Sequence, residues 1–422
     1  MKDKLIDFGS FRAHYIKTDK FKTITIRVIL KSDAKKEEMT IRNFLTSFLT
    51  YSTATYKTKQ EIAIQAQELY GVNIYTKAYR AGTKSMINFF TTMLNEKYTD
   101  TGMMEETIKF LADIIFNPNF NDKNKYQEAY DFLVKTAETA MKAIKENPTN
   151  YSIIRMLEEM ADDVYSYRDA GYLEDLEAIN KETLTKYYEQ IIKESLVDVY
   201  VIGNFDEEEM TKYLKKYLIF ETFKSPKSSQ LITHGKLTKK IKEVKESVDG
   251  NQSKLSIGCK IGDLTEFERN YVLTLYNLIV GGSAESKFFK IIREKHSLAY
   301  YVSASLNKLD NLMIIKAGIA KENYNKTLKL IKELMREMVK GKFEEEDIEV
   351  AKKTYITLLK EVEDSETAII ETYLAKDLLN LGDINERKKE IMKVTKEDII
   401  KVAKKVHLDT VFLLEANNEE AE

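Results

Sequence analysis

Apolar and polar positions along this chain follow two spacings, and the order in which the spacings appear is repeated. Alternating apolar and polar residues predict strands, whereas apolar residues three or four apart predict amphipathic helices. The predicted strands are 23–30, 72–79, 85–94 and 196–202 in the first half and 254–261, 299–305, 312–318 and 410–414 in the second. The predicted helices are 37–53, 59–69, 105–115, 122–146, 151–162, 181–192 and 206–218, then 266–280, a short helix after 282, 323–339, 344–363, 366–379 and 396–406.

The repeated order of elements predicts two similar domains that arose by duplication. The chain of 422 residues also exceeds the length at which one core keeps growing. Segment 223–235 has little periodicity and contains Pro226 among lysines and serines, so we interpret this region as a linker. We expect domains at 1–222 and 241–422 joined by a linker at 223–240. The expected fold class is α+β, in which each domain has a mixed, mainly antiparallel sheet packed against long helices.

Composition excludes several classes of protein. The 66 basic and 68 acidic side chains nearly cancel, which argues against an extended nucleic-acid-binding surface. Cys259 is the single cysteine, so neither an intrachain disulfide nor a cysteine zinc cluster can form. No early stretch has the pattern of a signal peptide, and no window approaches 18 uninterrupted apolar residues. We therefore expect a cytoplasmic protein that does not insert into a membrane.

The stretch GGSAESKFFKIIREKHSLAYYVSA at 281–304 combines a Gly-Gly break, a short amphipathic helix and a strand. Arg293 and Tyr300 are seven residues apart, about two helical turns, and would face the same way if the helix persisted. A guanidinium and a phenol are well suited to donating hydrogen bonds to peptide carbonyls. The pattern alone favours the ordinary interpretation, in which Arg293 is a solvated helix residue and Tyr300 a half-buried strand aromatic.

The same stretch resembles a motif of the pitrilysin/insulinase family of zinc metallopeptidases, mitochondrial processing peptidase included. Further matching motifs occur in the order that the family has. They are Asn147-Pro148 after a long helix, GYLEDL at 171–176, INKETL at 179–184 and VYVIGNF at 199–205. The resemblance covers nearly the whole chain, and the order of these short motifs makes it specific.

The sequence departs from active members of this family at the metal site. Those members carry His-x-x-Glu-His on the first-half helix, where two histidines bind zinc and the glutamate activates water. Asn43, Thr46 and Ser47 occupy the matching positions here, and Ala140 stands where a further glutamate ligand would be. Glu138 is nearby but points elsewhere on a helix. The four histidines, His14, His234, His296 and His407, include no pair at helical ligand spacing. No cofactor is expected on this chain.

The resemblance implies a non-catalytic, substrate-binding subunit of a heterodimeric zinc metallopeptidase that acts on peptides or small proteins. A homologous partner subunit would carry the zinc, although a homodimer stays open. By the same resemblance, Tyr300 would donate a hydrogen bond to the scissile carbonyl as it becomes an oxyanion, and Arg293 would hold a neighbouring carbonyl. An extended peptide could join a strand edge by β-augmentation.

Two alternatives remain. In the first, the chain is a catalytically inactive structural or interaction protein of the same fold. In the second, it is a metal-independent enzyme, which no motif supports. The segment RAGTKS at 80–85 lacks the glycine and lysine spacing of a phosphate-binding loop, and a serine-histidine-aspartate set cannot be recognised from sequence.

Overall fold

The computed structural model describes residues 3–161, 163–221, 231–233, 236–237 and 240–417. Most of the predicted linker at 223–240 lies outside these residues. The chain forms two compact units. The first unit comprises 1–142, 167–230 and 366–370, and the second comprises 143–166, 231–365 and 371–422. Segment 143–166 is thus counted with the second unit, although it precedes the end of the first unit in sequence.

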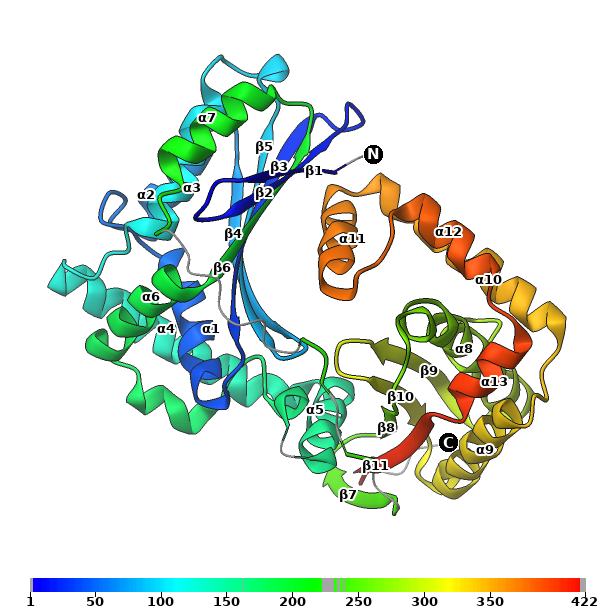
Figure 1. Ribbon diagram of the computed structural model, residues 1–422. Coiled ribbons are helices and arrows are strands. Elements are labelled where there is room, and N and C mark those ends of the chain that lie inside the picture. The colour runs from blue at the N-terminus through cyan, green and yellow to red at the C-terminus, as the bar shows by residue number, and fades with distance from the viewer. Residues whose placement is uncertain (1–2, 162, 222–230, 234–235, 238–239, 418–422) are drawn as a thin grey trace. The chain divides into compact units, whose positions relative to one another are not determined.

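The first unit is built on a sheet of six strands in the order β1-β2-β6-β3-β5-β4 (Figure 1). The β2–β6 pair is parallel and the other pairs are antiparallel. The strands are β1 Asp3–Asp7, β2 Arg12–Lys17, β3 Thr23–Asp33, β4 Asn73–Ala81, β5 Lys84–Leu94 and β6 Leu196–Gly203. The helices are α1 Met39–Leu49, α2 Lys59–Glu68, α3 Met103–Phe116, α4 Lys123–Lys142, α6 Lys181–Glu194 and α7 Glu207–Tyr217.

The helices of this unit gather on one face of the sheet (Figure 1). Successive strand residues point to opposite faces, so Ile26 and Val28 of β3 enter the core beneath the helices. Arg27, between them, faces the other way. Its guanidinium donates hydrogen bonds to Asn88 Oδ1 at 2.9 Å and Tyr79 Oη at 2.8 Å. Arg27 is therefore a buried polar group on the second face of the sheet whose hydrogen bonds are made by neighbouring side chains.

The second unit repeats the same strand arrangement. Its sheet has the order β7-β11-β8-β10-β9, with β7 parallel to β11 and every other pair antiparallel. Strands β7, β11, β8, β10 and β9 thereby correspond to β2, β6, β3, β5 and β4 of the first unit. The strands are β7 Lys242–Val248, β8 Ser253–Ile261, β9 Ala299–Asn307, β10 Leu312–Ile319 and β11 Val406–Ala416. This correspondence confirms the predicted duplicated α+β fold with mixed, mainly antiparallel sheets.

The helices that follow β8 along the chain supply the main core of the second unit. A π-helical turn, Glu268–Val272, runs into α8 Leu273–Val280, and α8, α9 and α13 pack around the odd-numbered residues of β8, such as Ile257 and Cys259. The remaining helices are α9 Tyr324–Val339, α10 Glu345–Glu361, α12 Ile384–Met392 and α13 Lys396–Ala403, together with α11 Glu366–Leu379, whose residues 366–370 are counted with the first unit. Among the described residues, no helix has the length and apolar character needed to cross a membrane.

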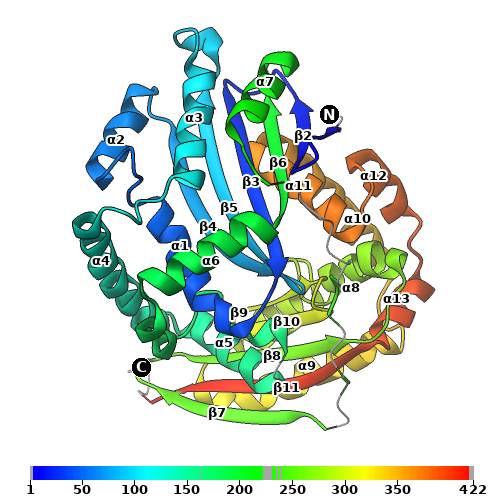
Figure 2. The ribbon, with the colours of Figure 1, turned by 60° about the vertical axis from the view of Figure 1, so that its left-hand side comes forward.

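Helix α5, Pro148–Met160, covers the opposite face of the second sheet (Figure 2). Its Met156 and Met160 pack with Phe412 and Leu414 of β11. Gly258 of β8 leaves room for this contact, because a Cβ there would lie 2.9 Å from Met160 Cε. The Ser152 and Ser256 hydroxyls are hydrogen-bonded at 2.9 Å. Helix α5 is therefore an integral layer of the second unit.

Candidate functional site

The predicted Arg293 and Tyr300 lie on either side of a sharp turn between a helix and an edge strand. The helix, Phe288–Lys295, is π-helical and ends before Tyr300, so the two residues do not share a helical face. Ser297 adopts φ 51°, and its N–H donates to the Arg293 carbonyl. The N–H of Leu298 donates to the Ile292 carbonyl at 3.0 Å. The hydrogen bond from Ser297, which has a positive φ, is that of an αL C-cap, and this cap redirects the chain into β9.

Arg293 has an exposed side chain with contacts inside its own helix. Its guanidinium carbon lies 4.6 Å from the centroid of the Phe289 ring, and Nη1 lies 3.4 Å from Glu294 Oε1. The side chain remains 42% exposed. Because exposed ion pairs contribute little to stability, these contacts orient the guanidinium without fixing it.

Tyr300 is the extra residue of a β-bulge. Tyr301 pairs with Gly318 and Ala299 pairs with Ile319, so Tyr300 is the residue inserted between these two pairs. Bulges redirect side chains and frequently occur beside functional sites. The Tyr300 side chain is 51% exposed, and β9 forms one edge of the sheet (Figure 1). The phenol is therefore accessible from solvent at the edge of the second unit.

The neighbouring Tyr301 anchors this strand from the other side of the pleat. Its hydroxyl is hydrogen-bonded to Thr149 Oγ1 at 3.1 Å, and Lys254 Nζ lies 5.7 Å from its ring centroid. A Cβ at Gly318 would lie 2.5 Å from the ring, so only glycine accommodates it there. Burial raises the pKa of Tyr301, although the Thr149 hydrogen bond opposes this shift. Tyr301 is thus a neutral structural residue that holds the backbone of Tyr300.

Residues at and before the Gly-Gly break occupy the outer hydrogen-bonding groups of β9 at Ala304. The Ala304 N–H donates to the Gly281 carbonyl at 2.8 Å, and the Asn277 amide donates to the Ala304 carbonyl at 3.3 Å. A Cβ on Gly281 would lie 2.8 Å from that of Ala304, which explains the glycine. The outer hydrogen-bonding groups of Ala304 are therefore already occupied, whereas Tyr300 lies beyond this closed part of the edge.

Three of the four residues at the expected metal positions meet in the first unit. Asn43 and Ser47 on α1 and Ala140 on α4 line one cavity of about 150 Å³. Thr46 is not among the lining residues and is buried, with its hydroxyl donating to the Asn43 carbonyl at 2.7 Å. The remaining lining residues are Thr40, Phe44, Leu133, Thr136, Ala137, Met141, Ala170 and Leu176.

The chemistry of this cavity does not fit zinc. Zinc in proteins is bound by imidazole, thiolate or carboxylate groups, and none lines the cavity among the described residues. The Asn43 amide donates to the Ala170 carbonyl at 3.2 Å. Glu138 is not a lining residue and pairs with Lys142, which lowers the pKa of Glu138. Water activation by a metal therefore has no support in these residues.

Comparison with known proteins shows what this chain is similar to. Residues 178–355 match the family model described as Peptidase M16 inactive domain. Probable inactive metalloprotease YmfF of Bacillus subtilis (strain 168) is 29% identical over 414 residues, covering 96% of each chain. The chain is an M16 metallopeptidase homologue.

Solved structures agree with this assignment. A conserved protein from Enterococcus faecalis V583 has a TM-score of 0.89 and 25% identity, and the match covers 99% of each chain. A peptidase M16 inactive domain from Pseudomonas fluorescens has a TM-score of 0.80 at 14% identity over 100% of each chain, a likeness that concerns the fold alone. The coarser part of the resemblance, a pitrilysin-like inactive M16 homologue, is thereby confirmed.

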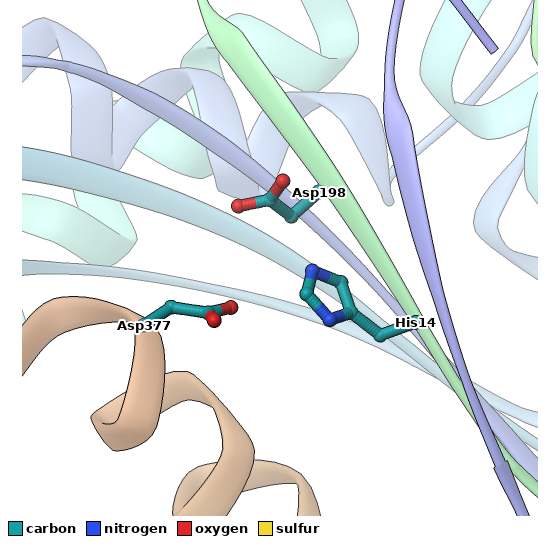
Figure 3. Close-up of side chains that lie close together, drawn as sticks. All are labelled: His14, Asp198 and Asp377. Carbon is teal, nitrogen blue, oxygen red and sulfur yellow. The ribbon is translucent and has the colours of Figure 1, made fainter. Parts of the chain in front are cut away.

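The M16 homologue also has a polar cluster that the sequence did not indicate. His14 on β2 and Asp198 on β6 project from neighbouring strands of the first unit (Figure 3). His14 Nδ1 lies 3.0 Å from Asp3 Oδ2, and the imidazole stacks on the Tyr200 ring. Asp377, also labelled in Figure 3, lies on α11 in the second unit.

Asp198 is already neutralised by cations of its own unit. Its carboxylate forms ion pairs with Arg12 Nε at 2.8 Å and with Lys31 Nζ. Burial raises the pKa of Asp198, whereas the charges and hydrogen bonds of Lys31 and Arg12 lower it. The combined effect of the two cations is larger, so the pKa of Asp198 lies below its usual value. A carboxylate committed to two cations is a weak metal ligand, so we interpret this cluster as structural.

Proposed function

We propose that this M16 homologue is a non-catalytic, peptide-binding subunit that acts with a zinc-bearing homologous subunit. The observation that carries the proposal is the combination of an exposed Arg293 and Tyr300 with a cavity at Asn43, Ser47 and Ala140 that lacks zinc ligands. A chain that keeps donors for peptide carbonyls, while Asn43, Ser47 and Ala140 stand at the family's metal positions, is suited to half of an active site.

In this proposal Tyr300 donates its phenolic hydrogen to the scissile carbonyl as negative charge develops on the oxygen. One oxyanion donor stabilises such a transition state by about 3–4 kcal/mol. Arg293 holds a neighbouring carbonyl of the substrate. An extended peptide pairs with the part of β9 near Tyr300, since Gly281 and Asn277 occupy the edge at Ala304.

The test is peptide cleavage by this chain co-expressed with a zinc-bearing homologue. Tyr300→Phe removes only the hydroxyl and is expected to lower kcat by about 100- to 1,000-fold. Arg293→Met is expected to raise KM, because the guanidinium contacts substrate away from the reacting bond. Tyr98→Phe is the matched control, since Tyr98 is also exposed, at 49%, but lies on the first unit. Full cleavage by the Arg293→Met/Tyr300→Phe double variant would contradict the catalytic role.

The second candidate is a catalytically inactive structural or interaction protein. Two observations favour it: the Arg293 guanidinium already packs on Phe289 of its own helix, and the relative from Bacillus subtilis carries a name that describes it as inactive. This candidate predicts stable association with a homologous chain, in a heterodimer or a homodimer, and turnover that neither substitution changes. Size-exclusion chromatography of the co-expressed pair, combined with the cleavage assay, separates the two functions.

A further inference from the structure

A cavity in the second unit has apolar walls and charged groups of one sign. Its volume is about 320 Å³, and it lies where α13 ends and β11 begins, against the second half of α9. Helices α9 and α13 pack against each other in this unit (Figure 1). The volume is at the lower end of the range of small-molecule pockets, about 300–1,000 Å³. The lining residues are Ile241, Lys332, Met335, Arg336, Val339, Ala403, Val406, His407 and Leu408.

Helix α9 supplies two cations and one wall of this cavity from a single face. Lys332 and Arg336 are one turn apart, and Met335 and Val339 are also one turn apart. Residues three or four apart on a helix are neighbours on its surface, so these side chains face the cavity together. Met335 is buried and Val339 is partly buried against the core. The charged groups therefore lie directly beside an apolar wall.

The start of β11 completes the apolar part of the cavity. Ala403 and Val406 are buried members of the core of the second unit, and Ile241 and Leu408 pack against that core. His407 is exposed, so it lies at the mouth of the cavity. Because the walls are continuous with the core, an apolar chain placed there would be removed from water, which is favourable.

The positive charge of Arg336 has no ion pair to balance it. Lys332 Nζ lies 3.4 Å from Glu243 Oε1, so the charge of this lysine is balanced in part. The Arg336 side chain forms neither an ion pair nor a hydrogen bond with any residue that the structure describes. No aspartate or glutamate is among the described residues that line the cavity. The lining therefore carries a net positive charge.

The acidic residues of α9 nearest to Arg336 do not occupy the cavity. Glu333 lies 3.9 Å from Lys329, and it is not a lining residue. Glu337 follows Arg336 in sequence and so lies about 100° further around the helix. The dipole at the end of α9 favours a cation in the last turn, but it amounts to only about half an elementary charge. An anion in the cavity would therefore be stabilised.

The lining also indicates what kind of anion fits. Among the described lining residues there is no side-chain hydroxyl or amide. A sugar, a nucleotide or a peptide would give up hydrogen bonds to water at several neutral polar groups without gaining side-chain partners in the cavity. A ligand with a single anionic end and an uninterrupted apolar chain has no such groups to satisfy.

We propose that this cavity binds a carboxylate with an apolar chain, of the medium-chain fatty-acid class. The planar guanidinium of Arg336 holds the carboxylate through two parallel hydrogen bonds, and Lys332 adds a donor at the same end. The chain packs on Met335, Val339 and Val406. This site goes beyond the proposed function, since it is formed by the second unit alone and includes no residue assigned to peptide binding.

Isothermal titration calorimetry with octanoate tests the site on the full chain alone. The expected result is saturable binding of one octanoate, weakened at least about tenfold in Arg336→Met, which keeps an apolar side chain but removes the charge. Lys326→Met is the matched control. It removes another exposed cation of α9, about 15 Å away along the helix, and should leave binding unchanged. Octylamine has the same chain with the opposite charge and should bind at least about tenfold more weakly than octanoate.

The length of the chain gives a second, independent readout. Each buried methylene strengthens binding roughly fourfold, so octanoate should bind about 15-fold more tightly than hexanoate. Val339→Gln places an amide in the apolar wall and should reduce this ratio. Circular dichroism checks that each variant is folded. If Val339→Gln does not fold, Arg336→Met and the chain-length series of the unmodified protein decide.

Three results would overturn the proposal. They are the absence of saturable binding, equal binding of octanoate and octylamine, and equal binding of octanoate by Arg336→Met and the unmodified chain. Binding of a peptide that ends in a leucine carboxylate, without binding of octanoate, would also overturn it, because the ligand would then be a chain terminus. None of these results bears on peptide cleavage, so this site and the proposed function stand or fall separately.

Discussion

At the scale of single residues, the buried Asp198 of the first unit is a charge whose ion pairs we expect to contribute to the free energy of unfolding. Its side chain is 1% exposed, and both of its cationic partners come from other strands, Arg12 from β2 and Lys31 from β3. Removing one member of a buried ion pair leaves the other charge without compensation, which is far more costly than losing an exposed pair. The carboxylate therefore ties three adjacent strands together.

Asp198→Asn should lower the free energy of unfolding by about 3 kcal/mol, because Lys31 would stay largely buried without its partner. Urea denaturation monitored by circular dichroism measures this loss. The matched control is Glu285→Gln, which breaks the exposed pair with Lys290 and should change stability by less than about 1 kcal/mol. Equal effects of the two substitutions would show that Asp198 contributes no more than a surface charge.

The lowered pKa of Asp198 also sets the direction of its pH dependence. A carboxyl whose pKa is lower when folded contributes stability above its unfolded value of about 3.8, and this contribution is lost as the pH falls through the folded value. The unmodified chain should therefore lose stability in acid more steeply than Asp198→Asn. Parallel acid-denaturation curves for the two proteins would contradict this assignment.

The individual site residues illustrate how far sequence reasoning extends. The family motif predicts that the residues at the metal positions lie close together. The structure shows that Asn43, Ser47 and Ala140 line one cavity. The hydrogen bond between Thr149 and Tyr301 joins residues far apart in sequence, and no spacing rule could have indicated it.

At the scale of elements, the Gly-Gly break fixes where α8 ends and how β9 is held. Gly281 has no room for a side chain, because a Cβ would lie 2.5 Å from the Phe288 ring and 2.8 Å from Ala304 Cβ. Its carbonyl accepts the Ala304 N–H, so any shift of this glycine would move β9 as well. The break thereby couples the helix end to the strand that carries Tyr300.

Gly281→Ala should destabilise the protein by about 1–3 kcal/mol, the usual cost of adding atoms to a packed interior. Thermal unfolding measures this change. Gly250→Ala is the matched control, because a Cβ on Gly250 meets no atom within 4 Å and its φ is not in the left-handed region. In a cleavage assay with a zinc-bearing partner, Gly281→Ala should also reduce turnover. Unchanged stability would mean that the neighbouring side chains move aside freely.

The elements that sequence patterns missed have identifiable causes. Strand β2, RAHYIK, has Ile16 as its single β-branched residue, so it lacks the composition that marks a strand. Strand β7, KEVKESV, is a charged edge strand that is mostly exposed or partly buried. The π-helical segments add a residue within a helix without a clear change of pattern. Strand β3 is buried on both faces, yet it was predicted correctly because its segment TITIRVIL is rich in β-branched residues.

At the scale of the whole molecule, the two units are interleaved along the chain. Helix α5 belongs to the second unit, yet it precedes α6, β6 and α7 of the first unit in sequence. A fragment starting at residue 231 would contain every strand of the second sheet but would lack α5. The apolar face formed by Leu312, Phe412 and Leu414 would then lose the side chains of Met156 and Met160.

Fragment 231–422 alone should therefore be less stable than the second unit in the full chain, by up to about 3–6 kcal/mol for the two methionines. Adding a synthetic peptide of residues 143–166 should restore stability, because it supplies the missing layer. A peptide carrying Met156→Asp and Met160→Asp is the control and should not rescue the fragment. Thermal unfolding at increasing peptide concentration measures the effect, and identical curves with and without peptide would contradict the assignment of α5.

The position of α5 has a consequence for synthesis on the ribosome. Its partners on β11, Phe412 and Leu414, are translated more than 250 residues after Met160. At about 5–20 residues per second, the apolar side of this helix would wait roughly 10–50 s before its full binding surface exists. We therefore expect the nascent chain to be bound by chaperones that shield exposed apolar helices, and the second unit can be completed only after β11 has been synthesised.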